Sequence, residues 1–373
     1  MKYNLIYVLL VFSMLFIKIC FSKTKNNQEL KDKISQMIIV GFNGEELVEN
    51  SQIYNDITKL HIGGVILFNK NAQNPNIKKN IKDFDQLKQL TTDLQSISKI
   101  PLFIAIDQEG GKVSRLNDNF DVSRLSQQQL GNNNDLELTK KEAEKTANTL
   151  KQLGININFA PCVDLSINKN STIIAQKGRA FSDNPEIVIN NAEKFIEAHS
   201  SLNILPVLKH FPGHGSAEGD THNGYVDITN TYQKIEMEPY KKLLKKYKNI
   251  GVMVAHLFDS NIDKNYPLSL SYNNINNNLK KNLNFVGLIF SDDLQMKALT
   301  KQFSWQDIII NAVNAGNDIL LIANNLNYDP NIAEKTTNII LKAIENKQIS
   351  IERIEESYYK IMKIKSKLQK NTI

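Results

Sequence analysis

The segment Phe285-Val286-Gly287-Leu288-Ile289-Phe290-Ser291-Asp292-Asp293 shows the pattern that decides the fold, because a short apolar run ends abruptly in polar and acidic residues. Similar apolar runs occur at 37–41, 64–68, 102–106, 155–160, 204–208, 251–255 and 318–323. Near-continuous apolar runs of this length indicate strands of a parallel sheet that is covered on both faces. Eight such runs predict an α/β protein, a single-domain (β/α)8 TIM-type barrel, more naturally than an open doubly wound sheet.

Segments with helical spacing of apolar residues separate these runs. One is Ile77-Ile81-Phe84-Leu87-Leu90-Leu94, and another is Ala192-Phe195-Ile196-His199, which follows a helix start at Asn184-Pro185-Glu186. We expect one barrel domain over residues 28–373 that ends with a helical region at 349–368. In such a barrel the functional residues lie on the loops that follow the strands.

The composition is that of an ordinary globular protein. The chain has 373 residues, of which 41% are hydrophobic and 23% are charged, and its formal net charge is +6. Its two cysteines, Cys20 and Cys162, exclude a disulfide framework and a zinc site built from several thiolates. The lysines form no basic stripe interleaved with aromatic residues, so we expect no nucleic-acid partner.

Residues 1–22 have the pattern of a secretory signal peptide. Lys2 precedes a mostly apolar stretch from Leu5 to Cys20, after which the chain becomes polar. We therefore expect an exported protein, periplasmic or anchored to a membrane through this segment. Lipidation at Cys20 and an uncleaved anchor are two forms of that expectation, and a cytoplasmic location is the alternative.

Residues 209–222 contain three of the six histidines and allow three interpretations. In the first, His210, His214 and His222 bind a metal ion together with Asp220. In the second, the segment is a tight loop with hydrogen-bonded histidines. In the third, Asp220 orients His222 for proton transfer near neutral pH, carried on a glycine-containing mobile loop.

Two further segments supply candidate residues. Asp292 and Asp293 follow a predicted strand, where one carboxylate can act as a nucleophile while its neighbour caps the helix predicted over 294–300, so we expect the pair to divide these two roles. Asp107 follows another predicted strand. Arginine occurs at only four positions, and Arg115 and Arg179 flank glycine-containing loops. Arginine, aspartate, lysine and histidine together suit a polyhydroxyl ligand, because each sugar hydroxyl both donates and accepts hydrogen bonds.

Five motifs in order resemble the bacterial β-N-acetylglucosaminidases of glycoside hydrolase family three. They are Ile106-Asp107-Gln108-Glu109-Gly110-Gly111, Asn158-Phe159-Ala160-Pro161, Gly178-Arg179-Ala180-Phe181, the segment Lys209 to His222, and Ser291-Asp292-Asp293-Leu294-Gln295-Met296. The resemblance covers about Ile38 to Ala323. The chain departs from the family at Thr221, where serine is usual, and at Lys112, where arginine is common. From its length we expect a one-domain form without the second domain that many relatives carry.

The resemblance implies a role for each candidate residue. Asp292 is the expected nucleophile and His222 the acid/base, supported by Asp220. The expected sugar-binding residues are Asp107, Arg115, Arg179, Lys209 and His210. The expected activity is that of a retaining β-N-acetylhexosaminidase that releases terminal N-acetylglucosamine from peptidoglycan fragments or related glycans, with no cofactor, no metal and no obligate protein partner.

Three alternatives remain open from the sequence. The same barrel can carry a metal-dependent hydrolase that uses the three histidines. It can be a sugar-binding lipoprotein without turnover. It can also be a phosphorylase, because a neutral imidazole does not repel phosphate as an acceptor in the way that a second carboxylate would.

Overall fold

The computed structural model describes residues 27–369, except 75, 78 and 117. Residues 1–22 and Cys20, on which the export prediction rests, lie outside this range. Among the described residues, no helix has both the length and the apolar character needed to cross a membrane.

Eight parallel strands form the centre of the molecule, and their order is β7-β6-β5-β4-β3-β2-β1-β8. A bridge between Phe290 and Ile319 joins β7 to the start of β8, and the backbone N–H of Ser291 donates to the Ile319 carbonyl at 3.0 Å. These contacts close the sheet, so the predicted (β/α)8 barrel is confirmed. The strands are β1 (Ile38–Gly41), β2 (Gly64–Ile66), β3 (Phe103–Ile106), β4 (Ile157–Asn158), β5 (Leu205–Phe211), β6 (Gly251–Val254), β7 (Ile289–Ser291) and β8 (Leu320–Ile322).

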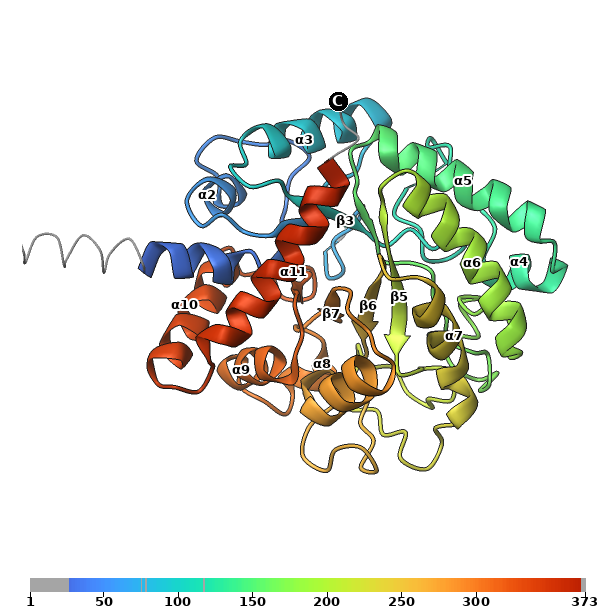
Figure 1. The fold of residues 1–373 in the computed structure, drawn as a ribbon. Helices are drawn as coiled ribbons and strands as arrows, with labels where there is room; N and C mark the ends of the chain where they lie inside the picture. The colour runs from blue at the N-terminus through green and yellow to red at the C-terminus, as the bar shows by residue number, and fades with distance from the viewer. Residues whose placement is uncertain (1–26, 75, 78, 117, 370–373) are drawn as a thin grey trace, which may run out of the picture.

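Helices surround the strands, and α11 runs diagonally to the left of the labelled strands β3, β5, β6 and β7 in the view of Figure 1. The α-helices are α2 (Gln52–Thr58), α3 (Phe84–Ser96), α4 (Gln127–Asn133), α5 (Leu136–Gln152), α6 (Pro185–Ser201), α7 (Glu238–Lys246), α8 (Lys297–Thr300), α9 (Trp305–Ala315), α10 (Ile332–Glu345) and α11 (Ile351–Gln369). Two short 3-10 helices, η1 (Lys234–Met237) and η2 (Leu268–Leu270), and a π-helix, η3 (Asn273–Asn282), also occur, and the described residues 27–35 before β1 are helical.

Alternation along each strand separates the two sides of the barrel wall. Ile39 of β1 belongs to the core cluster that includes the barrel interior, whereas Ile38 and Val40 pack with the helices α2 and α3 outside it. Inside the barrel, the Phe159 and Phe290 rings meet edge to face with their centroids 5.6 Å apart. Apolar side chains therefore fill the interior, which leaves the strand ends for polar chemistry.

The predicted start of α6 is confirmed, whereas the predicted start of α3 is wrong. Asn184 caps α6 and Pro185 occupies its first turn, as the sequence predicts. The predicted helical run from Ile77 is wrong at its start, because α3 begins at Phe84, after Asp83 accepts the Gln86 backbone N–H at 2.9 Å.

Most strands are shorter than the predicted runs, for example β4, which spans Ile157–Asn158 of the predicted 155–160, and two further boundaries bear on the site. The strand predicted at 204–208 continues to Phe211 as β5 and includes Lys209 and His210. The strand predicted at 285–290 is shorter at its start, because β7 begins at Ile289. β7 ends directly before Asp292, whereas β5 carries Lys209 and His210 within its last three residues.

Candidate active site

A cavity of about 510 Å³ lies at the carboxyl ends of the strands. Seven of the eight predicted site residues line it, on segments that follow β3, β4, β5 and β7 or on β5 itself. They are Asp107, Arg115, Arg179, Lys209, His210, His222 and Asp292. The eighth, Asp220, is hydrogen-bonded to His222. The barrel thus brings together residues that are far apart in the sequence.

An ion-pair network forms one wall of the cavity. Asp107 accepts from Lys209 Nζ at 2.9 Å and from Arg115 Nη2 at 3.1 Å. Lys209 also contacts Glu109 at 2.7 Å. Glu109 in turn accepts from Nε and Nη2 of Arg179 at 2.9 and 2.8 Å. The network therefore joins two carboxylates to three cations.

The charges in this network are mutually stabilised. Burial by itself raises the pKa of Glu109, but Arg179 and Lys209 outweigh burial and bring that pKa to about 2. Asp107 behaves in the same way, because Lys209 and Arg115 hold its pKa well below the usual range despite burial. Both carboxylates are therefore ionised near neutral pH and act as hydrogen-bond acceptors.

Arg115 keeps guanidinium donors that no described residue accepts. Its guanidinium lies 5.4 Å from the centroid of the Phe68 ring. Its Nε is buried and has no hydrogen-bond partner among the described residues. The pair with Asp107 uses only Nη2, and Arg115 lines the cavity, so other donors of its guanidinium remain for a ligand there.

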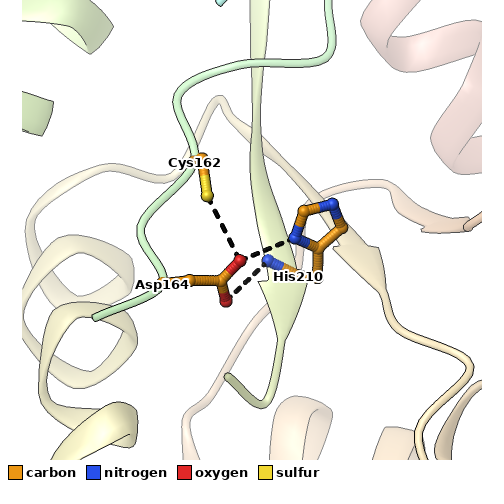
Figure 2. Close-up of side chains that lie close together, drawn as sticks. All are labelled: Cys162, Asp164 and His210. Atoms are coloured by element: carbon orange, nitrogen blue, oxygen red, sulfur yellow. Dashed lines mark hydrogen bonds and ion pairs between the residues drawn. The ribbon is translucent and has the colours of Figure 1, made fainter. Parts of the chain in front are cut away.

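His210 lines the cavity and is hydrogen-bonded to Asp164, as Figure 2 shows for this pair. Its Nδ1 lies 2.6 Å from Asp164 Oδ2, and Arg179 Nη2 donates to its Nε2 at 3.1 Å. An ionised carboxylate only accepts and a guanidinium only donates, so the proton of His210 lies on Nδ1. Burial raises the pKa of Asp164, but His210 and the backbone N–H of His214 hold it well below its usual range.

Asp292 and Asp293 follow β7 and have different surroundings. Asp292 is half-buried and lines the cavity, and its Oδ1 accepts the Asp293 backbone N–H at 2.8 Å. Burial by itself raises the pKa of Asp292. The histidines His256, His210 and His222 lower this pKa and together outweigh burial, so the pKa lies below its usual value. Asp292 is therefore an ionised carboxylate that faces the cavity.

Asp293 does not cap the helix predicted over 294–300. The helix α8 begins at Lys297, and Asp293 Oδ1 accepts the backbone N–H groups of Gln295 at 3.2 Å and Ala323 at 2.9 Å. It thereby ties the loop after β7 to the end of β8. Burial, reinforced by the charge of Asp292, raises the pKa of Asp293 to about 7.

Asp220 and His222 form a pair on the loop after β5. Asp220 Oδ1 lies 2.8 Å from His222 Nδ1 and also accepts the His222 backbone N–H at 2.9 Å. Burial lowers the pKa of His222, but the hydrogen bond to Asp220 and the charge of Asp292 raise it above the usual value. The His222 side chain is 51% exposed, so its Nε2 is available to a bound substrate.

The four residues proposed above for a metal ion do not form one cluster. In the part of the chain that the structure describes, one group has metal-ligating atoms close enough together, and it consists of Cys162, Asp164 and His210. His214 is buried near His210, and His222 lies on the exposed loop with Asp220. The histidines therefore do not converge on a shared point.

Comparisons with known proteins agree with this geometry. The sequence profile of the Glycosyl hydrolase family 3 N terminal domain matches residues 29–364. The chain belongs to glycosyl hydrolase family 3.

Three proteins that are similar to this family 3 chain indicate which enzymes of the family it resembles. "Beta-hexosaminidase A" of Pseudoalteromonas piscicida is 32% identical over 341 residues, which are 85% of this chain and 55% of that protein. "Beta-hexosaminidase" of Nitrosomonas eutropha is 33% identical over 74% of this chain and 76% of its own length. A family 3 beta-N-acetylglucosaminidase structure from Paenibacillus sp. str. FPU-7 aligns with a TM-score of 0.82 and 28% identity, covering 91% of this chain and 62% of that one. The chain thus spans little more than half of the first of these relatives.

Two acidic residues of this family 3 site were not among the predicted site residues. Glu109 lies inside the quoted motif Ile106 to Gly111, and its partner Arg179 is 70 positions away. Asp164 follows the fourth apolar run, and its partner His210 is 46 positions away. For both residues the sequence offers one signal, which is their position after a predicted strand. This signal does not identify the residue with which each carboxylate pairs.

Proposed function

We propose that this family 3 chain is a retaining β-N-acetylhexosaminidase that hydrolyses terminal, non-reducing N-acetylglucosamine. The observation that carries the proposal is the cavity that holds the ionised Asp292 together with the Asp220–His222 pair. The names of the two curated relatives and of the Paenibacillus structure support the choice of sugar.

The reaction has two steps. Asp292 attacks the anomeric carbon, while the His222 imidazolium gives a proton to the leaving oxygen. Water then attacks the glycosyl-aspartate, and His222 takes the proton of that water. Most glycosidases use two carboxylates for this work, but a neutral imidazole does not repel an acidic aglycone in the way that a second carboxylate does.

The ion-pair network holds the sugar. Asp107 and Lys209 present ionised groups to the ring hydroxyls, and Arg115 adds guanidinium donors that its pair with Asp107 does not use. His210 and Arg179 complete the wall. Charged partners hydrogen-bond neutral hydroxyls more strongly than neutral ones do, so this wall favours a polyhydroxyl ligand over an apolar one.

The rim of the cavity supports an anionic group next to the sugar. Lys70, Lys112 and Lys177 line the cavity and are exposed. Peptidoglycan fragments carry carboxylates, so we extend the proposal to such fragments as substrates and to an exported protein that meets them outside the cytoplasm. Cell fractionation followed by mass spectrometry of the mature N-terminus tests the location and the processing of residues 1–22.

The same lysines favour one second candidate, in which inorganic phosphate replaces water as the acceptor. Phosphate is then expected to raise turnover, with N-acetylglucosamine 1-phosphate as the product. Hydrolysis predicts instead free N-acetylglucosamine and a rate that is independent of phosphate.

The test of the main proposal is release of a chromogenic aglycone from a β-N-acetylglucosaminide by the purified protein. Asp292→Ala should be inactive and still bind N-acetylglucosamine, whereas Asp293→Asn should lose less activity than Asp292→Asn. Proton NMR of the first product should show the β anomer. Activity of Asp292→Ala within tenfold of the parent, or an α-anomeric first product, contradicts the mechanism.

A further inference from the structure

A buried cluster lies behind the cavity wall and has no part in the proposed chemistry of Asp292 and His222. It consists of a thiol from Cys162, a carboxylate from Asp164 and the Nδ1 side of His210 (Figure 2). Cys162 is 0% exposed, Asp164 1% and His210 7%. One ligating atom from each of the three lies within 4.8 Å of the others.

We propose that Cys162, Asp164 and His210 bind a thiophilic divalent cation of the Zn²⁺ class, and that the bound cation impairs sugar recognition at His210. Sulfur, imidazole nitrogen and carboxylate oxygen are the three kinds of ligand that Zn²⁺ takes in proteins. The fourth tetrahedral position remains for water or for a nearby side chain.

The present distances are close to those of a bound metal. Cys162 Sγ lies 3.2 Å from Asp164 Oδ2, and His210 Nδ1 lies 2.6 Å from the same oxygen. Tetrahedral bonds of about 2.3 Å to sulfur and about 2.1 Å to nitrogen and oxygen separate these pairs by about 3.6 and 3.4 Å. A movement of less than about 1 Å by the side chains thus makes room for the ion.

His214 provides an independent indication of a ligand at this place. Its side chain is 2% exposed, and neither ring nitrogen has a hydrogen-bond partner among the described residues. Its ring centroid lies 5.8 Å from that of His210, and its backbone N–H donates to Asp164 Oδ1 at 2.8 Å. A buried imidazole with uncommitted nitrogens beside a sulfur, nitrogen and oxygen cluster is what a metal site needs for a further ligand.

Binding changes the protons of two groups. The Cys162 thiol loses its proton to solvent and binds as thiolate, so one proton is released for each cation. The proton on His210 Nδ1 moves to Nε2, because Nδ1 must offer its lone pair to the metal. Nε2 then becomes a donor that faces the donor Nη2 of Arg179, which now lies 3.1 Å from it. His210 then loses the hydrogen bond from Arg179, and the two donors repel each other in the wall that binds the sugar.

The cysteine content makes the spectroscopic test specific. Cys20 and Cys162 are the two cysteines of the whole chain, so Cys20→Ser leaves Cys162 as the one thiol. The probe is Cd²⁺, which resembles Zn²⁺ in ligand preference and gives a thiolate charge-transfer absorbance in the ultraviolet. We expect Cys20→Ser to develop this absorbance to a stoichiometry of one and to release one proton per Cd²⁺.

The matched control is Cys20→Ser/Cys162→Val, which keeps an apolar side chain of similar size at the buried position. It should show no charge-transfer absorbance. If its melting temperature shows that it fails to fold, Cys20→Ser/Cys162→Ala replaces it. Absence of the band from Cys20→Ser, or an equal band in the control, overturns the metal site.

The effect on sugar recognition rests on the proposed function, whereas the absorbance test does not. Saturating Zn²⁺ should lower kcat/KM of the Cys20→Ser variant by more than tenfold and that of the double variant by less than twofold. Equal inhibition of both variants shows that Zn²⁺ acts on other groups, such as Asp220 and His222, and overturns the proposed switch. If neither variant has activity, the proposed function fails and the Cd²⁺ titration still decides the site.

Discussion

Arg179→Lys and Arg115→Lys should have different effects, although both arginines line the same cavity. Arg179 is 9% exposed and makes four hydrogen bonds, to both oxygens of Glu109, to the Ile173 carbonyl and to His210 Nε2. Arg115 has a 27% exposed side chain and makes one ion pair, with Asp107. Arg179→Lys should therefore reduce stability, and Arg115→Lys should reduce catalysis.

The size of the stability loss follows from the bonds that lysine cannot replace. A single ammonium keeps one contact with Glu109 and loses the second, together with the bonds to Ile173 and His210. Hydrogen bonds to charged groups contribute roughly 1.5–3 kcal/mol each, and Glu109 keeps Lys209 as a partner, so we expect a loss of about 2–4 kcal/mol. An unfolding entropy of about 2.1 cal/mol/K per residue over roughly 340 residues converts this loss to a Tm decrease of about 3–6 °C.

Arg115→Lys leaves Asp107 paired with Lys209, so its Tm should fall by less than about 2 °C. Lysine has no counterpart of the Nε donor or of the planar guanidinium above Phe68. Loss of one ligand hydrogen bond should lower kcat/KM roughly tenfold, which equals about 1.4 kcal/mol.

Calorimetric melts and steady-state kinetics on the same preparations provide the measurement. For Arg179→Lys, kcat/KM is corrected for the folded fraction at the assay temperature. A Tm decrease of Arg115→Lys equal to that of Arg179→Lys refutes the distinction drawn from their contacts. Unchanged kcat/KM in Arg115→Lys removes Arg115 from the sugar-binding residues.

Two predictions concern the pair on the loop after β5. Asp220→Ala/His222→Ala should be little slower than His222→Ala alone, because the two residues act as one unit. A substrate with an activated aryl leaving group should partly restore the activity of His222→Ala. Additive losses in the double-mutant cycle would instead make His222 a binding residue. A general acid must be protonated, so the raised pKa of His222 carries the alkaline limb of kcat/KM to higher pH. The Asp220 carboxylate, whose pKa is lowered to about 2, stays charged across this pH range and raises the pKa of His222. Asp220→Asn should therefore move the alkaline limb of kcat/KM to lower pH. An unmoved limb would show that another group titrates there.

The fold was predictable because its signals are local. Each apolar run needs only its own residues to indicate a buried strand, and Asn184-Pro185 defines the start of α6 without reference to distant parts of the chain. The continuation of β5 through Lys209 and His210 has no such local signal. These two polar residues are stable in the strand because carboxylates on other loops pair with them. Lys209 contacts Asp107 and Glu109, and His210 contacts Asp164.

The same distinction between local and distant partners applies to the site. Asp220 and His222 are two positions apart, so their pairing was predictable from the sequence, and the structure places them in hydrogen-bond contact. Glu109 was missed because nothing near it in the sequence reveals that Arg179 will bind both of its oxygens. Scarcity of arginine identified Arg179 as a special residue but not its role, since sugar binding and loop anchoring both use a planar guanidinium.

Asp292 and Asp293 show most clearly what sequence alone cannot supply. The two side chains are chemically identical and adjacent, so composition and spacing cannot assign the nucleophile to one of them. The barrel separates them by giving Asp293 two backbone donors, from Gln295 and Ala323, and by burying it until its pKa reaches about 7. Asp292 instead faces the cavity, and neighbouring histidines lower its pKa. Because a nucleophile must be ionised and exposed to substrate, only Asp292 of the two meets both requirements.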